Sequence, residues 1–334
     1  MNSKAAVILL LLLTIFLFIA NVFFGAISIP IRDTWAVLTG QAVENEAYRF
    51  IIMESRFPQA VTALTAGAGL SAAGLMLQTL FRNPLAGPSI LGITSGAGLG
   101  VALIVLLFGG LLSSGINSLG VNLAVMTGAA AGSFFILAIL LLTARRVRNN
   151  LTLLIVGMMT GYLASSVVTL LSSVSTAAGI QNFVMWGMGS FGGVSLQNLP
   201  WFLGVSLAGL GISILFAKPL NLLLLGDNYA ANLGVNVKKA RFWLLFSSGI
   251  LASIITACCG PIGFIGLAMP HIARLLLHSD DHRQLLPASM LCGAALALLC
   301  NLLSVMPDGM VIPINALTPI AGVPVVLYVI LKKR

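Results

Sequence analysis

The sequence predicts an all-α integral membrane protein with about ten transmembrane helices, and three observations support this fold class. Of the 334 residues, 59% are hydrophobic and only 7% are charged, whereas a soluble domain carries about 25% charged residues. The mean hydropathy of +1.07 agrees with this composition. Apolar runs of roughly 20 residues, long enough to cross a bilayer, recur along the chain. Such a chain cannot cover the surface of a soluble globule, so only the membrane class fits.

The apolar runs define the predicted spans. The first follows Lys4 and exceeds the roughly 7–15 residues of a signal-peptide core, so we interpret it as an uncleaved span. The eighth is short and contains glycine and proline, which leaves nine or ten as the total. Segments 30–57 and 178–198 are expected outside, each with a short helix. The pattern GAGLSAAG at 67–74 predicts close packing within the chain, with an oligomer face as the alternative. The predicted spans are 5–27, 58–80, 90–109, 119–143, 151–173, 199–217, 240–259, 262–278, 285–305 and 314–331.

Lysine and arginine residues predict which loops face the cytoplasm, because those loops carry an excess of cations. With ten spans, the cation-bearing loops all fall on one side, together with both termini. This placement explains the net charge of +9 without a nucleic acid partner. The cations on this side are Arg82, Arg145, Arg146, Arg148, Lys218, Lys238, Lys239, Arg241, Arg274, Arg283, Lys332, Lys333 and Arg334.

The chemistry that the sequence lacks narrows the function. It contains no Walker A motif, no HExxH and no GxSxG, so we predict no catalytic residue and no ATP hydrolysis by this chain. All eight acidic residues lie in predicted loops, whereas ion-coupled carriers usually keep an ionisable group within their spans. The four cysteines lack a metal-binding spacing and are interpreted as small apolar filler.

The stretch RNPLAGPSILG at 82–92 separates two long apolar runs. Arg82 would cost roughly 2.5–3.5 kcal/mol in hydrocarbon, and Pro84 and Pro88 cannot continue a helix because each lacks an N–H. The second span therefore ends near Phe81, and the third begins near Pro88. Two interpretations stay open for this stretch: an ordinary membrane turn, or a functional element on the cytoplasmic side.

A second cytoplasmic segment, LLLLGDNYAANLGVNVKKARF at 222–242, contains a short polar helix from Asp227 to Leu233. Gly234 follows as a helix stop, and basic residues precede the next span. A short helix along the cytoplasmic face is a natural docking surface for a soluble partner. An ordinary loop is the alternative interpretation.

The third segment, 260–287, contains His271, His278 and His282. The last two are spaced to share one helix face, which would suit a metal ion or a membrane-embedded metalloenzyme. The DDHR run at 280–283 is more typical of a solvated, salt-bridged loop. We therefore predict no metal site.

Together these segments resemble the FecCD-type permeases of type II ABC importers, which take up iron–siderophore complexes, haem and cobalamin. The signature residues are Arg82, Asn83, Pro84, Pro270, His271 and Arg274. The matching pieces are RFP at 56–58, Gly74 with Gln78, RNPLAGPSILG at 82–92, LG at 233–234, GFIGLAMPHIAR at 263–274, DHRQLLP at 281–287 and IPINALTPIAGVP at 312–324.

The resemblance implies a type II ABC-importer permease architecture over a single domain, 1–334, in the bacterial inner membrane. It implies a chain that is not itself an enzyme and binds no cofactor. Its partners would be a second copy of the permease, membrane lipid, and two cytoplasmic ABC ATPases that hold ATP and Mg²⁺. A periplasmic or lipoprotein substrate-binding protein would deliver the ligand. A self-sufficient secondary transporter or channel is the alternative function.

The resemblance also assigns roles to residues. The coupling segment spans about 221–237, and the pathway gate maps to the start of the fifth span, where amides would contact ligand or cap the helix. For the pathway lining, plain helix packing is the alternative at each position. The residues in an ATPase cleft would be Gly226, Asp227, Ala230, Ala231, Leu233 and Gly234; the gate would be Asn149, Asn150, Leu151 and Thr152; the lining candidates are Gln78, Met158, Met159, Thr160 and Ser165.

The sequence departs from the family pattern in its charges. Of an arginine pair outside the second span only Arg56 is kept, since Gln59 replaces the other, which makes Arg56 the candidate for docking the binding protein. Relatives often carry Asp and Arg where this chain has Asn301 and Val305, and an acidic residue where it has Ile312. The ligand stays open among siderophore complexes, haem and cobalamin.

Overall fold

The computed structural model describes residues 3–43, 45–112, 118–147, 149–305 and 312–332. Three of the predicted cytoplasmic cations, Arg148, Lys333 and Arg334, lie outside the described residues. The α-helices are α1 (Ser3–Phe23), α2 (Ile31–Leu38), α3 (Glu46–Phe50), α4 (Phe57–Phe81), α5 (Ile93–Leu112), α6 (Ser118–Arg146), α7 (Asn150–Ser173), α8 (Ala177–Gly187), α9 (Leu199–Leu215), α10 (Ala217–Leu224), α11 (Asp227–Asn232), α12 (Val237–Cys259), α13 (Ile265–Leu277), α14 (His282–Ser304) and α15 (Ile314–Lys332).

These helices coincide with the predicted spans. Within the described ranges, six helices are long and apolar enough to cross a membrane, and α9 with α10 forms a bent pair of that kind, with an angle of 50° between them. Helices α5, α13 and α15 are also apolar, but their apolar lengths are shorter. The agreement is close: α4 covers Phe57–Phe81 where the sequence predicts 58–80. The prediction of an all-α protein with about ten spans is confirmed.

Helix α4 lies in the middle of the bundle and is buried along most of its length, with α14, α12 and α13 packed against it. Glycine permits this close approach. A Cβ on Gly67 would lie 2.2 Å from the carbonyl oxygen of Gly293, and one on Gly74 would lie 1.7 Å from that of Gly266. The small residues at 67–74 therefore pack helices of the same chain together, as predicted.

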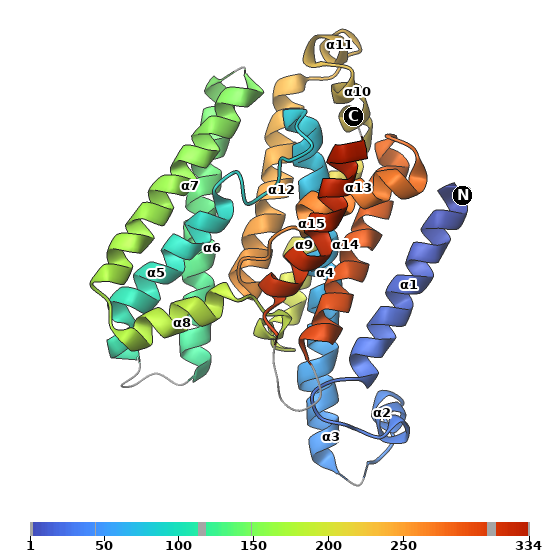
Figure 1. The fold of residues 1–334 in the computed structure, drawn as a ribbon, viewed down its shortest axis with the longest axis vertical. Helices are drawn as coiled ribbons and strands as arrows, with labels where there is room; N and C mark the ends of the chain where they lie inside the picture. Colours follow the sequence, from blue (N-terminus) through green and yellow to red (C-terminus); the bar gives the residue numbers. More distant parts are fainter. Residues whose placement is uncertain (1–2, 44, 113–117, 148, 306–311, 333–334) are drawn as a thin grey trace.

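Helices α5, α6, α7 and α8 form a second group, which packs on the rest through α12 (Figure 1). The start of α1 and the end of α15 lie at the same end of the molecule as α11, whereas α2 and α3 lie at the opposite end (Figure 1). We call these the α11 end and the α2 end. The short helices α2 and α8 occupy the two segments in which the sequence predicts them.

A buried amide pair joins α1 to α14. The Asn301 amide donates to Asn21 Oδ1 at 2.8 Å, and the Asn21 amide donates to the Leu298 carbonyl at 3.0 Å. Both asparagine side chains are buried. A polar group left unpaired in hydrocarbon is costly, and here Asn21 Oδ1 accepts from Asn301 while the Asn21 amide donates to backbone carbonyls. A neutral pair thus occupies the position where relatives often carry an acidic residue.

Candidate functional site

The predicted coupling segment forms two short helices, α10 and α11, joined at Gly226. Gly226 has φ 117°, a left-handed backbone value that a residue with a Cβ rarely adopts. Gly234, with φ 86°, follows the end of α11 and acts as the predicted helix stop. Of the predicted coupling residues, Ala230 is fully buried. The others that follow it, Ala231, Leu233 and Gly234, are exposed.

Asp227 connects α11 to two other parts of the chain. Its Oδ1 pairs with Arg82 Nη2 at 2.9 Å, and its Oδ2 pairs with Arg241 Nη2 at 3.4 Å. Arg82 is about half exposed, but Arg241 is buried and also donates to the Val147 carbonyl at 3.1 Å. The sequence identifies Arg241 only as a cytoplasmic cation. In the structure it ties α12 to α11 and to the segment before α7.

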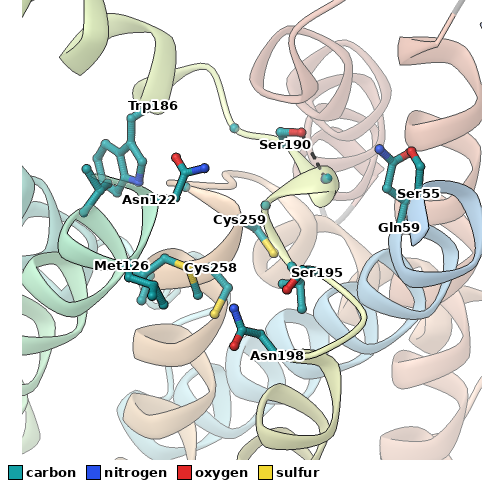
Figure 2. Close-up of a pocket in the computed structure, with 18 of the residues that line it drawn as sticks. Ser55, Gln59, Asn122, Met126, Trp186, Ser190, Ser195, Asn198, Cys258 and Cys259 are labelled. Carbon is teal, nitrogen blue, oxygen red and sulfur yellow. Dashed lines mark hydrogen bonds between the residues drawn. The ribbon is translucent and has the colours of Figure 1, made fainter. Parts of the chain in front are cut away.

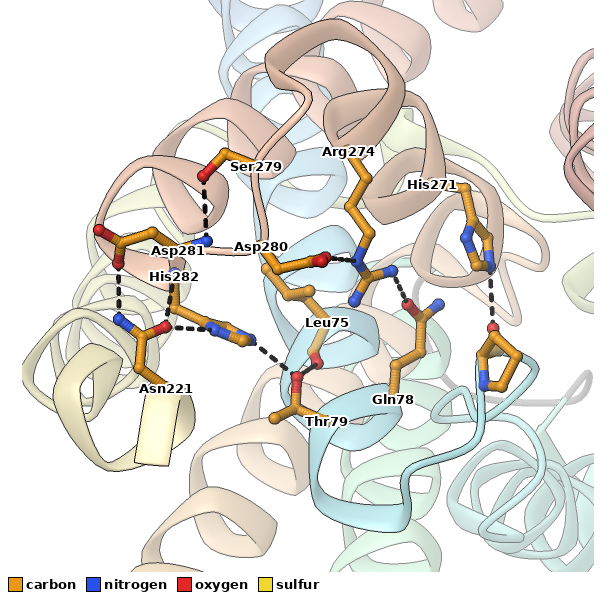
Figure 3. Close-up of polar contacts among 11 residues, drawn as sticks. Leu75, Gln78, Thr79, Asn221, His271, Arg274, Ser279, Asp280, Asp281 and His282 are labelled. Carbon is orange, nitrogen blue, oxygen red and sulfur yellow. Dashed lines mark hydrogen bonds and ion pairs between the residues drawn. The ribbon is translucent and has the colours of Figure 1, made fainter. Parts of the chain in front are cut away.

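The 82–92 loop and the end of α4 before it are held in place by contacts with α7, α11 and α13. Arg82 ends α4 with a left-handed φ of 48°. His271 Nε2, on α13, lies 2.9 Å from the Pro84 carbonyl, and the Asn150 amide, on α7, donates to the Leu80 carbonyl at 2.7 Å. His271 thus links the loop to α13 (Figure 3), and the Asp227 pair links its first residue to α11. The Asn150 bond ties the adjacent end of α4 to α7. The stretch is more than a turn between two spans.

Gln78 and Arg274 form a buried polar contact between α4 and α13. Arg274 Nη1 donates to Gln78 Oε1 at 2.9 Å (Figure 3). The Gln78 amide donates to the Leu267 carbonyl at 3.1 Å. Arg274 Nε also pairs with Asp280 at 3.4 Å. The Gln78 side chain is thus occupied between helices in this structure, and its role in the pathway stays a prediction. Pro270 is buried within α13 beside this contact.

The predicted gate lies at the start of α7. Asn149 caps this helix, since its Oδ1 accepts from the Leu151 N–H at 2.9 Å. Leu151 and Thr152 are exposed on the first turn. The predicted lining residues further along α7 are exposed or half-buried: Met159 and Ser165 are exposed, and Met158 and Thr160 are half-buried. Helix α7 therefore presents a broad, mostly apolar surface that this chain does not cover.

Arg56, the predicted docking residue, is buried in this structure. Its guanidinium donates to the carbonyls of Phe23, at 2.7 Å, and of Val22, at 3.3 Å, and also to that of Ile27. A helix leaves its last carbonyls without partners, so Arg56 caps the end of α1. A docking role for Arg56 stays a prediction.

A cavity of about 440 Å³, which the sequence does not signal, lies between α6, α8 and α12 (Figure 2). Polar and apolar side chains share its wall, among them Gln59, Asn122, Met126, Trp186 and Cys258. Its lining comes from the beginnings of α4 and α6, from the ends of α8 and α12, and from segment 189–198 between α8 and α9.

The three histidines do not gather at one point. His271 contacts the 82–92 loop, His278 ends α13 with a left-handed φ of 51°, and His282 starts α14. In the part of the chain that the structure describes, no group of three His, Cys, Asp or Glu side chains is arranged to hold a metal ion.

Comparisons with known proteins agree with this architecture. The haemin transport system permease protein HmuU of Yersinia pestis is 36% identical over 329 residues, which cover 97% of this chain and 95% of that protein. The vitamin B12 import system permease protein BtuC of Klebsiella pneumoniae is 37% identical over 287 residues, 86% of this chain and 84% of that one. A solved inward-facing structure of the metal-chelate type of ABC transporter matches with a TM-score of 0.84 at 31% identity, over 99% of this chain and 100% of that chain. The model of the FecCD transport family matches residues 12–332, and the chain belongs to this family of transport proteins.

Proposed function

We propose that this chain is the permease subunit of an ATP-driven ABC importer and forms the pathway for a large metal chelate or tetrapyrrole. Its cargo class is an iron–siderophore complex, haem or cobalamin, in keeping with the haemin and vitamin B12 systems of its relatives. The observation that carries the proposal is the segment α10–α11. It stands out from one end of the membrane bundle and is joined by ion pairs to the 82–92 loop and to α12 (Figure 1).

The proposal includes the partners and the orientation. The α11 end faces the cytoplasm, where two ATPase subunits hold ATP and Mg²⁺ and close on α11. The uncovered surface of α7 packs on a second copy of the chain, so that the pathway lies between two permeases in a bacterial inner membrane. A binding protein delivers the ligand to the α2 end. A rigid helix seated in a groove passes on rigid-body motion, and this chain supplies no chemistry of its own.

Photocrosslinking tests where the ATPase binds. Leu233→Cys, at the end of α11, places a thiol on a residue that is 54% exposed. The four native cysteines are buried, so a benzophenone maleimide will label position 233 selectively. We expect illumination of the assembled complex to join this position to the ATPase, as detected by mass spectrometry.

Thr39→Cys, on an exposed residue just after α2, is the matched control. It should crosslink to the binding protein or to nothing. A crosslink from position 39 to the ATPase, with none from position 233, would place the ATPase at the wrong end for this proposal.

Arg82→Ala removes one of the two ion pairs of Asp227. The pair is about half exposed, and exposed pairs contribute roughly 0.2–1 kcal/mol. We therefore expect uptake in liposomes to fall about two- to fivefold, with binding-protein docking unchanged because that protein meets the α2 end. Lys4→Ala, which removes an exposed cation from α1, should leave uptake unchanged. Lost docking with normal ATPase coupling would show that the loop lies on the opposite face.

A further inference from the structure

A buried hydrogen-bond cluster joins α10 to α4 and α14, away from the ion pairs of α11. His282, the first residue of α14, is fully buried. Its backbone N–H and its ring Nδ1 each lie 2.8 Å from Asn221 Oδ1, on α10. Its Nε2 lies 2.8 Å from the hydroxyl of Thr79, on α4 (Figure 3). One imidazole ring therefore contacts two other helices through both of its nitrogens.

The acceptor chemistry fixes the direction of these bonds. The Asn221 Oδ1 atom can only accept, so His282 donates to it from the backbone and from Nδ1–H. With a neutral ring, the Thr79 hydroxyl donates to Nε2. The Leu75 carbonyl, one turn earlier in α4, lies 3.0 Å from the same hydroxyl and competes with Nε2 for its single hydrogen. Each ring nitrogen of His282 thus has a hydrogen-bonding partner.

Both the nitrogen and the oxygen of the Asn221 side-chain amide form hydrogen bonds. Its NH₂ group donates to Asp281 Oδ1 at 2.6 Å, while its oxygen accepts the two bonds from His282. Asp281 also accepts from the backbone N–H of Arg283 at 3.0 Å, at the start of α14. The hydrogen bond from the Arg283 N–H has the larger effect and the one from Asn221 the smaller, and both lower the pKa of the Asp281 carboxyl below its ordinary value. Asn221 is thereby fixed to the first turn of α14 at three points.

Among the described residues, the other contacts that α10 makes with the bundle are apolar. Leu220 and Leu223 are buried. Their packing sets the distance between α10 and the neighbouring helices, but it does not set the position of α10 along them. Apolar contact is non-directional, whereas buried hydrogen bonds hold a particular geometry. The bonds at Asn221 set the register of α10 against α14, and the Thr79 hydroxyl extends that register to α4.

We infer that Asn221 and His282 are positioning residues that pass the movement of α11 to α14 and α4 during transport. The inference rests on the proposed function, since it assumes that an ATPase moves α11. A push on α11 reaches α10 through the short turn at Gly226. While Asn221 is hydrogen-bonded to His282, α10 and the first turn of α14 move together. Without these bonds, α10 can shift along the neighbouring helices, because its apolar contacts do not set its position along them. Neither residue needs to touch the cargo or the nucleotide.

Asn221→Ala tests the link in liposomes that contain the complete complex with its ATPase and binding protein. We expect the complex to assemble and to hydrolyse ATP. The number of cargo molecules imported per ATP should fall about fivefold, which converts to about 1 kcal/mol. A merely structural role would lower uptake and ATP hydrolysis together and leave this ratio unchanged, and that result would overturn the inference. Lys4→Ala, which removes an exposed cation from α1, should leave the ratio at the wild-type value.

A second variant covers the case in which Asn221→Ala yields no folded complex. Thr79→Val keeps the size of the side chain and removes only the hydroxyl that meets His282 Nε2. A lowered ratio in Thr79→Val supports the inference, and a wild-type ratio overturns it. Failure of the proposed function gives a different result, because then the wild-type complex itself shows no ATP-dependent import.

Discussion

Asp227→Ala should reduce ATP-driven uptake in liposomes at least about tenfold, a loss that corresponds to about 1.4 kcal/mol. The substitution removes both ion pairs that hold α11. Removing one partner of a buried pair is costly because the other charge stays buried, and Arg241 is buried. The effect should therefore exceed that of Arg82→Ala, which leaves the pair with Arg241 intact.

The control for this prediction is Glu46→Ala. Glu46 is an exposed acid on α3, and it makes no ion pair with the described residues. Its loss should leave the melting temperature at its wild-type value. Wild-type uptake by Asp227→Ala would show that α11 does not depend on these ion pairs.

Gly74→Ala should prevent the chain from reaching its native packing. The added Cβ would lie 1.7 Å from the Gly266 carbonyl oxygen, a backbone atom that no side-chain rotation can move away. Helices α4 and α13 would have to separate, at a cost of at least about 3 kcal/mol, the upper end of the usual range for overpacked cores. We expect little monodisperse protein in detergent and a clearly lowered melting temperature for any that is recovered.

Gly204→Ala, in α9, provides the matched control because no atom lies within 4 Å of the Cβ it would add. Alanine also favours a helix over glycine, so the melting temperature should stay the same or rise. Equal stability of the two alanine variants would contradict the close contact between α4 and α13.

The spans were predictable because they depend on local properties of the sequence. A bilayer needs a run of apolar residues of a given length, and Arg82 and Pro84 mark where such a run has to end. The extent of α11 was predictable for a similar reason, since Gly234 stops the helix close to the predicted Leu233. Short-range rules of this kind locate each element along the chain, but they do not identify its partners.

The pairings in the site are long-range and could not be predicted. Arg82 and Asp227 are both recognisable as polar residues in loops, but 145 positions separate them. Gln78 and Arg274 are 196 positions apart. Their hydrogen bond holds the Gln78 side chain between α4 and α13, and the sequence does not show this contact.

Arg56 shows the same limit at shorter range. The family resemblance makes Arg56 a candidate for docking the binding protein, which stays a prediction, and the sequence does not show that Arg56 contacts the end of α1. The capping contact with the Phe23 carbonyl follows from the packing of α1 on α4. The pairing of Asn301 with Asn21 is a further contact between helices far apart in sequence.

The most direct test of the central claim is cargo uptake into liposomes, measured with this chain alone and with its ATPase and binding protein. The account predicts uptake by the complete complex that requires ATP and is stopped by vanadate, with no flux through the chain alone. Flux of the same cargo through the chain alone, unaffected by vanadate, would identify a self-sufficient transporter or channel and contradict the account.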